Sequence, residues 1–541
     1  MSKAFVSSIK EDLTLELKTI NSDQLAQGFL AGAKFLQAEE DKINELNVFP
    51  VPDGDTGINM SMTSDSGVAE VEKCESDSII DLAKIFARGL LMGARGNSGV
   101  SLSQYFRGLS VAIKNMQKDT LSTDDFITCF QSGRDVAYKA FKDPVEGTML
   151  TVIRESYEGV EGKHFDTFEE LFATYYEAAK KSEENTPNLL PVLKEANVTD
   201  SGGEGFLVFI EGMYKAICGQ MLSKTDELGE ENDHSKYEYE TKFYLVLNQT
   251  NLVVSDLRET LSVHGVVKIE KNDNNTLLIN IFTNDLGKVL TLCSQFGSLV
   301  QVEVKNNKLQ DKLPEVKKDE PLKEIALVSV AFGDGIKETF KELGCSVVIN
   351  GGQTMNPSTE SFVKACEEAH AKNVIIIPNN GNVIMAAEQA TKLVENVNVK
   401  VLRAKTIAQG YASLMAFDET SDIDTNLADM QEAVSQVKTG EVTYAVRDTS
   451  ISGVEIKAND FMGILDGNII VSKKDRVEAT KDLLKEAVDE DSAVVTIFKG
   501  NGVSDSEAEE LQNYISELNE DVECEVIDGK QEIYSYIISV E

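Results

Sequence analysis

The sequence predicts a multidomain protein with an all-helical first domain, a small α/β domain and a C-terminal α/β region. Apolar residues recur at helical spacing up to about Leu222, two polar stretches lack any period, and strands alternate with helices after the second stretch. Apolar residues three or four positions apart form one face of a helix. Strands that alternate with helices are typical of a sheet with helices on both faces.

The first 222 residues are predicted to form the all-α domain, because no stretch between Ser22 and Leu222 alternates as a strand does. An apolar stripe at its start indicates an amphipathic helix and consists of Leu25, Phe29, Ala33, Leu36, Ile43 and Leu46. Further helices are predicted over Ile79–Leu91, Ser98–Lys114, Thr123–Phe141, Thr167–Lys181 and Gly203–Leu222.

A polar, acidic linker, Ser223–Lys236, leads to a predicted α/β domain at residues 237–305. Its elements follow the order βαββαβ, which favours a ferredoxin-like sandwich. The strands are predicted at Thr241–Asn248, Val263–Lys271, Thr276–Thr283 and Leu299–Val304, and the helices at Ser255–Ser262 and Asp285–Phe296.

A second polar linker, Asn306–Glu320, precedes the C-terminal domain, residues 321–541. The predicted strands Ile325–Phe332, Cys345–Ile349, Val374–Pro378 and Lys400–Arg403 are each followed by a helix, which is typical of a parallel sheet. Later strands, after about Gly440, are shorter and linked by turns, so two lobes are expected, 321–439 and 440–541.

Composition narrows the classes of partner. A formal net charge of -39 argues against binding to nucleic acid or to an anionic membrane, and it favours either simple solubility or a partner with a basic face. The seven cysteines lie far apart, as reduced thiols do. We find neither an apolar run long enough for stable membrane insertion nor the apolar core of a signal peptide, so a cytoplasmic location is expected.

The segment NVFPVPDGDTGINM, residues 47–60, carries Asp53 and Asp55 on a glycine-containing turn after a helix that must end before Pro50. Two ionised carboxylates repel each other, so a site that holds both commonly contains a cation, and hard oxygen ligands suit Mg²⁺. An ordinary turn with solvated acids is the alternative.

Two further turns begin predicted helices, GARGNSG at residues 93–99 and DSGGEG at residues 200–205. Glycines allow a phosphate to approach the backbone, and the free N–H groups at a helix start bind anions. Alternatively, Ser98 is an N-cap and the second turn is a helix cap. Three such turns in one all-α domain favour a phosphate site, although neither the GxxxxGK[ST] loop nor an HRD motif is found.

These motifs resemble a known family. NVFPVPDGDTGINM, GARGNSGVSLSQ, PVEGTMLTVIRE and NVTDSGGEGF match, in order, motifs of the dihydroxyacetone kinase L-subunit fold. The version LNVFPVPDGDTG is similar to that of the bacterial fatty acid kinase catalytic subunit. The similarity continues through GGQTMNPSTESF, IIIPNNGNVIMAAEQA, KTIAQGYASLMAFD, TYAVRD and YIISVE, and so covers nearly the whole chain.

The resemblance implies a barrel of helices that binds ATP and two Mg²⁺ ions at one end. Asp53 and Asp55 match the catalytic, metal-binding acids, and Asn47 stands where a third ligand lies, which is Asp in glycerone kinases. The residues that match nucleotide-binding positions are Thr56, Gly57, Ile58, Asn59, Asn97, Ser98 and Gly99 at the phosphates, and Thr148, Met149, Asp200, Ser201 and Gly202 at the nucleoside.

The implied reaction transfers the γ-phosphoryl group of ATP to a fatty acid carboxylate and gives an acyl-phosphate for lipid synthesis. In this family the fatty acid arrives inside a separate lipid-binding carrier protein, which the C-terminal region is thought to dock. The sequence leaves open whether the chain forms a homodimer. The alternatives are a glycerone kinase, although its L-type domain comes last in single-chain enzymes, and a non-catalytic nucleotide-binding regulator.

Two features depart from the family pattern. The middle domain often carries a zinc site built from one Cys and two His, and Glu240, Asn280 and Phe282 stand at those positions here, so no structural zinc is expected. His264 alone is a poor ligand. In the loop PNNGN, Gly381 replaces the usual Lys, which puts a charged role of that loop in doubt.

Two loops of the C-terminal domain are predicted to contribute to carrier docking, Gly351–Ser358 and Thr406–Gly410. Both follow predicted strands, where open α/β sheets place their binding crevice. Turn and N-cap chemistry is the alternative for both loops, with the segment from Asn356 starting a helix.

Overall fold

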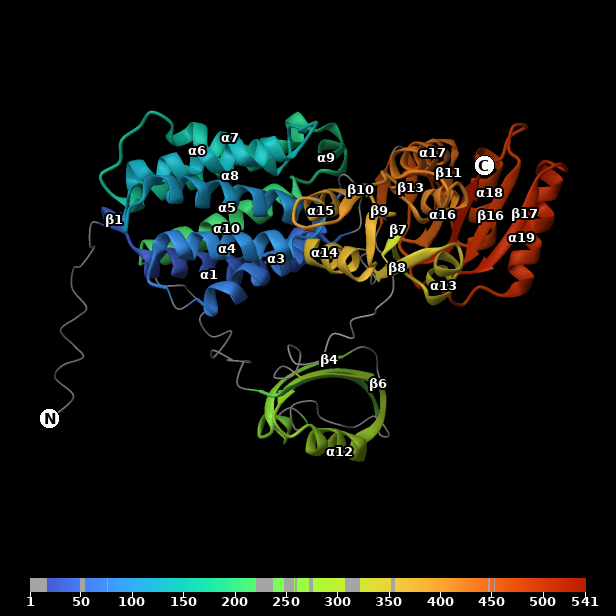
Figure 1. The fold of residues 1–541 in the computed structure, drawn as a ribbon, viewed down its shortest axis with the longest axis horizontal. Coiled ribbons are helices and arrows are strands. Elements are labelled where there is room, and N and C mark those ends of the chain that lie inside the picture. Colours follow the sequence, from blue (N-terminus) through green and yellow to red (C-terminus); the bar gives the residue numbers. More distant parts are fainter. Residues whose placement is uncertain are drawn as a thin grey trace. The chain divides into compact units, whose positions relative to one another are not determined.

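The computed structural model describes residues 17–48, 54–74, 76–219, 237–247, 257, 260–271, 276–306, 322–351, 356–445, 448–451 and 453–541. They belong to two compact units, of which one combines Met1–Met221 with Leu322–Glu541 and the other is Leu222–Pro321 (Figure 1). The first unit contains a helical domain, residues 17–219, and a C-terminal domain, residues 322–541. The domain boundaries given by the sequence stay predictions.

The helical domain confirms the predicted all-α character. Its helices are α1 (Ser22–Ala38), α2 (Glu40–Glu45), α3 (Thr56–Glu72), α4 (Ile79–Gly93), α5 (Gly96–Met116), α6 (Thr123–Ala140), α7 (Met149–Val160), α8 (Phe168–Leu189), α9 (Pro191–Ala196) and α10 (Ser201–Ile217). The first apolar stripe spans two helices rather than one, because the chain leaves helical geometry at Glu39. One two-residue ladder, β1 (Thr19–Ile20) with β2 (Leu121–Ser122), was not predicted.

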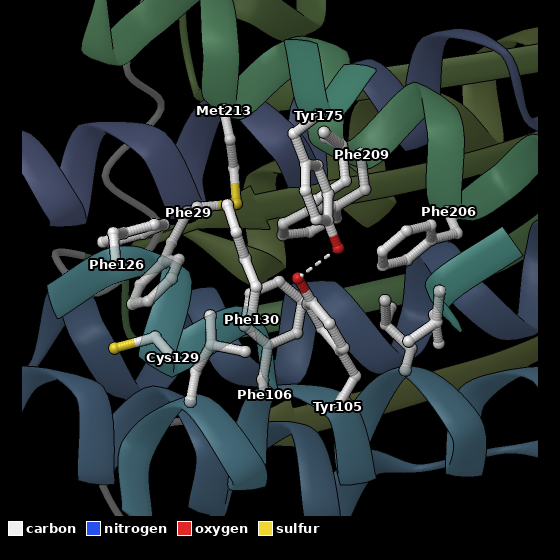
Figure 2. Packing of buried hydrophobic residues seen from close by; sticks show 14 of the residues in the cluster. Phe29, Tyr105, Phe106, Phe126, Cys129, Phe130, Tyr175, Phe206, Phe209 and Met213 are labelled. Carbon is white, nitrogen blue, oxygen red and sulfur yellow. Dashed lines mark hydrogen bonds between the residues drawn. The ribbon is translucent and has the colours of Figure 1, made fainter. Parts of the chain in front are cut away.

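Aromatic side chains fill the core of the helical domain. Phe29 and Phe86 stack with ring centroids 4.0 Å apart, and Phe106 meets both rings edge-on. Figure 2 shows the hydroxyl groups of Tyr105 and Tyr175 pointing toward each other, with 2.9 Å between the two oxygens. Each buried hydroxyl thereby satisfies the other, so both rings can be buried completely.

The C-terminal domain confirms the predicted α/β class. Its first sheet is parallel in the order β10 (Asn398–Val401), β9 (Ala371–Ile377), β7 (Lys323–Ala331) and β8 (Cys345–Asn350). The helices between and after these strands are α13 (Asp334–Glu342), α14 (Thr359–Glu368), α15 (Ile384–Ala390), α16 (Ile407–Met415) and α17 (Ile423–Gln436).

A second, mixed sheet completes this domain in the order β15 (Asn468–Lys473), β14 (Phe461–Leu465), β11 (Lys438–Tyr444), β18 (Tyr534–Val540), β16 (Val494–Lys499) and β17 (Glu523–Asp528). The hairpin β12 (Thr449–Ile451) and β13 (Val454–Ile456) and the helices α18 (Arg476–Ala487) and α19 (Asp505–Leu518) accompany it. Phe498 and Ile537 of this sheet lie in the same hydrophobic core as the parallel sheet.

The other unit contains an antiparallel sheet in the order β4 (Gly265–Lys271), β5 (Thr276–Thr283), β3 (Tyr239–Leu247) and β6 (Gly297–Asn306). Helix α12 (Leu286–Phe296) packs on it through Val289 and Cys293. The segment between β3 and β4, where another helix was predicted, lies largely outside the described residues. The ferredoxin-like assignment therefore stays a prediction.

The helical and C-terminal domains share a packed boundary. Ala94, the C-cap of α4, and Val100, near the start of α5, are fully buried in the hydrophobic core of the C-terminal domain. Helices α14 and α15 accordingly lie at the end of the helical domain where α3 and α5 begin (Figure 1). This boundary lies beside the residues that the sequence assigns to the active site.

Candidate active site

Asp55 lies at the N-terminus of α3 and is buried, with 3% of its surface exposed. The side-chain amide of Asn59, one turn into α3, donates to Asp55 Oδ1 at 2.9 Å. Gly54 has φ 66°, a conformation that a side chain disfavours. Asp55 is therefore not the solvated turn acid of the alternative interpretation. Asp53 lies outside the described residues.

The first turn of α3 is held by Asn44 of α2. The Asn44 Oδ1 atom accepts the N–H groups of Gly57 at 2.7 Å and of Ile58 at 3.3 Å. A Cβ atom on Gly57 would approach the carbonyl oxygen of Glu40 to 2.2 Å, so this glycine is required for packing of α3 on α2. In this structure the side-chain oxygen of Asn44 caps these two N–H groups of the helix, and phosphate contact by residues 56–59 stays a prediction.

The glycines of residues 93–99 allow α5 to approach α3 closely. A Cβ atom on Gly96 would lie 2.9 Å from the Asn59 amide nitrogen, and one on Gly99 would lie 2.4 Å from Thr63 Oγ1. Helix α5 begins at Gly96 with Arg95 as its N-cap. Ser98 is therefore inside the first turn, and the alternative that it is the N-cap is wrong.

Asp200 is the N-cap of α10, as the alternative interpretation of this turn proposed. Its Oδ2 accepts the N–H of Gly203 at 2.7 Å, and it also accepts a backbone hydrogen bond from Met149. Burial raises the pKa of Asp200 to about 6, and these two N–H donors oppose the rise. Met149 begins α7 directly after its N-cap Thr148, so Asp200 joins the starts of α7 and α10.

The predicted site turns come together in the fold. Ser201 Oγ donates to Thr56 Oγ1 at 3.1 Å, which joins the start of α10 to the start of α3. Gly202 packs against the side chain of Met149 at the start of α7. With Asn59 against Gly96, the N-termini of four helices that are distant in sequence meet in one region. Helix N-termini carry partial positive charge, so this region suits a polyanion.

Carboxylates surround one side of this region. Burial, together with the smaller effects of the charges of Glu204 and Asp200, raises the pKa of Glu183 on α8 to about 7. Glu204 accepts a 2.6 Å hydrogen bond from Lys42 Nζ, and that bond raises the lysine pKa. The nucleoside end of the predicted site is thus acidic, and Lys42 is one cation that partly balances it.

Three polar residues at the domain boundary were not assigned to the site from the sequence. They are Asn356, Arg95 and Asn382. The side-chain amide of Asn356 donates to Asp55 Oδ2, and Arg95 Nη1 donates to the Asn356 carbonyl at 2.8 Å. Asn382 Oδ1 accepts a hydrogen bond from Asn97 Nδ2 at 3.3 Å. Asn356 is separated from Asp55 by 301 positions, and no periodicity or motif signals such a contact.

The same geometry corrects the predicted docking role of residues 356–358. Asn356 and Ser358 are 2% and 5% exposed, so neither offers its side chain to a docking partner, and Asn356 donates instead to Asp55 of the helical domain. Ser358 caps α14 by accepting the Ser361 N–H, and Thr406 caps α16 by accepting the Gln409 N–H. N-cap chemistry, the alternative stated from the sequence, therefore describes both loops. Residues 352–355 lie outside the described residues.

The oxygen atoms of the described site residues are of the kind that bind a magnesium ion. Asp55 and Asn47 are both buried and offer carboxylate and amide oxygens, which are hard ligands. Among the described residues, which omit Asp53, no group of three or more His, Cys, Asp or Glu is arranged to hold a metal ion. Asp53, the other expected carboxylate ligand, lies outside these residues, so the two-magnesium site stays a prediction.

In the smaller unit, the three positions at which the resemblance places zinc ligands lie on neighbouring strands. Glu240 of β3 pairs with Phe282 of β5, and Asn280 pairs with Lys242 in the same ladder. Phe282 offers no ligand atom, so these three positions do not form a zinc site of the Cys-His-His kind.

Family models cover most of the chain in three successive matches. The C-terminal model of the FakA-like fatty acid kinases matches residues 326–541, the DAK2 domain matches 50–215, and the FakA-like middle domain matches 236–313. Protein YloV of Bacillus subtilis is 39% identical over 556 residues, which cover 97% of this chain and 100% of YloV. The chain belongs to the FakA-like fatty acid kinase family. The resemblance stated from the motifs is confirmed.

The FakA-like relatives of this chain include protein SSP1546 of Staphylococcus saprophyticus, 39% identical over 96% of this chain and 99% of its own length. Among solved structures, a DegV family protein of Corynebacterium glutamicum matches 40% of this chain and 97% of its own, at 13% identity and a TM-score of 0.31. The dihydroxyacetone kinase of C. freundii matches 54% of this chain and 56% of its own, at 14% identity and a TM-score of 0.30. These two structural similarities are too slight to indicate function.

None of the described helices is both long enough and apolar enough to cross a membrane.

Proposed function

We propose that this chain is an ATP-dependent kinase that phosphorylates the carboxylate of a fatty acid. The observation that supports this most directly is the meeting of helix starts through Ser201 and Thr56 and through Asp200 and Met149. Phosphoryl transfer depends on positioning and charge neutralisation more than on covalent chemistry of the protein. A set of helix N-termini beside a buried carboxylate, Asp55, supplies both.

Asp53, Asp55 and Asn47 would hold the magnesium ions, which neutralise phosphate charge when they are bound. Residues 56–59 and 97–99 would contact the phosphates, and residues 148–149 and 200–202 the nucleoside. A carboxylate acceptor is ionised at neutral pH, so the reaction needs no general base from the protein. The proposal is therefore compatible with a chain that has only four histidines.

The acyl substrate would be presented by a separate fatty-acid-binding protein, and the product would be an acyl-phosphate for lipid synthesis in the cytoplasm. Membership of the FakA-like fatty acid kinase family supports this choice of acceptor. The net charge of -39 would favour a carrier with a basic face. Docking would involve exposed residues of the C-terminal domain rather than the buried segment 356–358.

The decisive experiment measures ATP turnover and acyl-phosphate formation with carrier-bound fatty acid, with dihydroxyacetone, and with neither acceptor. Acyl-phosphate that forms only with the loaded carrier supports the fatty acid kinase. Phosphorylation of dihydroxyacetone alone would instead identify the chain as a glycerone kinase. Nucleotide binding without phosphorylation of either acceptor would identify a non-catalytic regulator.

A further inference from the structure

Asn356 is a buried residue of the C-terminal domain whose side chain reaches into the helical domain. It lies between β8 and α14 and is 2% exposed. Its amide nitrogen donates to Asp55 Oδ2, whereas the amide of Asn59 donates to Oδ1 of the same carboxylate. The two oxygens of Asp55 are therefore each held by an amide, one from each domain.

These contacts close a ring of hydrogen bonds. Thr63 Oγ1 donates to the Asn59 carbonyl at 2.6 Å and accepts the Arg95 N–H at 3.2 Å. Arg95 in turn donates from Nη1 to the Asn356 carbonyl at 2.8 Å. The path from Asp55 through Asn59, Thr63, Arg95 and Asn356 returns to Asp55, so the orientation of its carboxylate depends on both domains.

The ring lies beside a packed boundary. The N–H of Thr359, at the start of α14, donates to the Ala94 carbonyl at 3.2 Å. Ala94 and Val100 are fully buried in the hydrophobic core of the C-terminal domain. Asn356 thus approaches Asp55 from a packed segment, and a packed segment fixes side-chain rotamers.

Amide donors have a particular consequence for a carboxylate that binds metal. Each carboxylate oxygen has two lone pairs, so one hydrogen bond leaves a second site for a ligand. A neutral donor also orients the group without cancelling its charge. Hydrogen bonds to metal-binding carboxylates tune affinity, and their loss commonly lowers metal affinity or activity about 10–100-fold.

We infer that Asn356 is a positioning residue for the phosphoryl-transfer centre, supplied by the C-terminal domain, which holds Asp55 in its metal-binding orientation. The inference rests on the proposed function, because it takes Asp55 as a metal ligand. It makes the C-terminal domain part of the active site as well as the expected region of carrier docking. The catalytic site is then complete only when both domains are in place.

The test uses the full chain with Asn356→Ala and with Asn356→Leu, which keeps the side chain's branched shape but donates nothing. Asn426→Ala is the matched control, because Asn426 is 1% exposed and its side chain bonds within residues 418–426 of the C-terminal domain. Mn²⁺ is titrated by electron paramagnetic resonance with a non-hydrolysable ATP analogue, without carrier or fatty acid. Thermal unfolding of each variant is measured in parallel.

We expect both Asn356 variants to bind Mn²⁺ about 10-fold or more weakly, while Asn426→Ala binds it as the unaltered chain does. In EDTA the analogue should bind all four proteins equally. Equal Mn²⁺ affinity of the Asn356 variants and the unaltered chain would overturn the inference, as would an equal loss in Asn426→Ala. An unaltered chain that binds Mn²⁺ normally but forms no acyl-phosphate would refute the proposed function alone.

Discussion

Ser201 and Thr56 are 145 positions apart in the sequence, and their hydroxyl oxygens lie 3.1 Å apart at the starts of α10 and α3. Both residues are buried, at 4% and 5% exposure. Thr56 belongs to the predicted phosphate side and Ser201 to the predicted nucleoside side. The bond therefore fixes the two halves of the candidate nucleotide site relative to each other.

Ser201→Ala should weaken ATP binding about 5- to 10-fold, the equivalent of one hydrogen bond of roughly 1–1.5 kcal/mol. The loss should fall on the KM for ATP, with kcat changed much less, because the residue positions the binding loops. Steady-state kinetics at several ATP concentrations measure both. Ser103→Ala is the control, since that buried hydroxyl donates to the Val100 carbonyl within α5. An equal effect of the two substitutions would refute a specific role of Ser201.

Asp55→Asn should abolish phosphoryl transfer, by at least about 100-fold, because it removes one charge from the metal-binding set. Asn is preferred to Ala at this position, since Asn keeps one of the two side-chain oxygens that accept from the buried amides of Asn59 and Asn356, whereas Ala keeps neither. Asp53→Ala should have the same effect on transfer. Circular dichroism should show an unchanged helical spectrum. Near-normal turnover of either variant would exclude the two-magnesium assignment.

Glu183→Gln should make the protein more stable at high pH. Burial raises the folded-state pKa of Glu183 from its ordinary 4.5 to about 7, so the folded state keeps a proton that the unfolded chain releases. Stability is then lost as the pH rises from 4.5 to 7, and the full penalty persists above 7. The substitution should recover on the order of 2 kcal/mol at about pH 8 and almost nothing at about pH 4.

Thermal unfolding from about pH 4 to about pH 8 measures this difference. Glu184→Gln is the matched control, because Glu184 is the neighbouring residue on α8 and is exposed. A gain from Glu183→Gln that is the same at every pH would show that the buried charge is not its cause.

Elemental analysis of the purified chain should find well below one zinc ion per molecule. Glu240 and Phe282 face each other across β3 and β5, and Asn280 is the other replaced position, so a Cys and two His are all missing. Protein prepared in zinc-supplemented medium provides the stringent condition. One zinc ion per chain would mean that these positions are not the counterparts of the ligands in relatives.

Local pattern predicted most long helices of the first domain and the parallel sheet, but not α3 or α7, because helical and strand periodicities reflect burial against a neighbouring layer. The predicted strands at 345–349 and 374–378 correspond to β8 and β9 within a few residues. Less regular elements escaped prediction. Helix α3 begins within the turn motif itself, and β17 has a partly exposed pattern that does not mark a buried strand.

The site was predictable only in part. Turns with acids and glycines indicate anion and metal chemistry, and Asp55, Asp200 and the start of α5 do lie in one region. The contact between Asn356 and Asp55 joins two domains and leaves no mark in local periodicity. The role of Gly57 was also hidden, because packing against the Glu40 carbonyl and approach to a phosphate both require glycine.

Separating the two domains of the first unit should separate nucleotide binding from phosphoryl transfer to the fatty acid. A fragment of residues 1–222 contains Asp53, Asp55, Asn47 and the helix starts, so we expect it to bind ATP with Mg²⁺. The affinity should be lower than in the full chain, because Asn356 is absent and Ala94 and Val100 become exposed. Calorimetric titration with a non-hydrolysable analogue, with and without Mg²⁺, measures this loss. Fragment 323–541 should bind the loaded carrier without nucleotide.

The helical fragment should phosphorylate carrier-bound fatty acid about 100-fold or more slowly than the full chain. Docking converts a chance encounter between acceptor and phosphate into a nearly unimolecular step, and the fragment lacks that advantage. Asn356→Ala in the full chain is the necessary comparison, since it lacks the amide but keeps the rest of the C-terminal domain. If the fragment transfers phosphate no more slowly than the Asn356→Ala chain, the C-terminal domain acts only through Asp55. If the fragment is as fast as the unaltered chain, the C-terminal domain has no role in phosphoryl transfer.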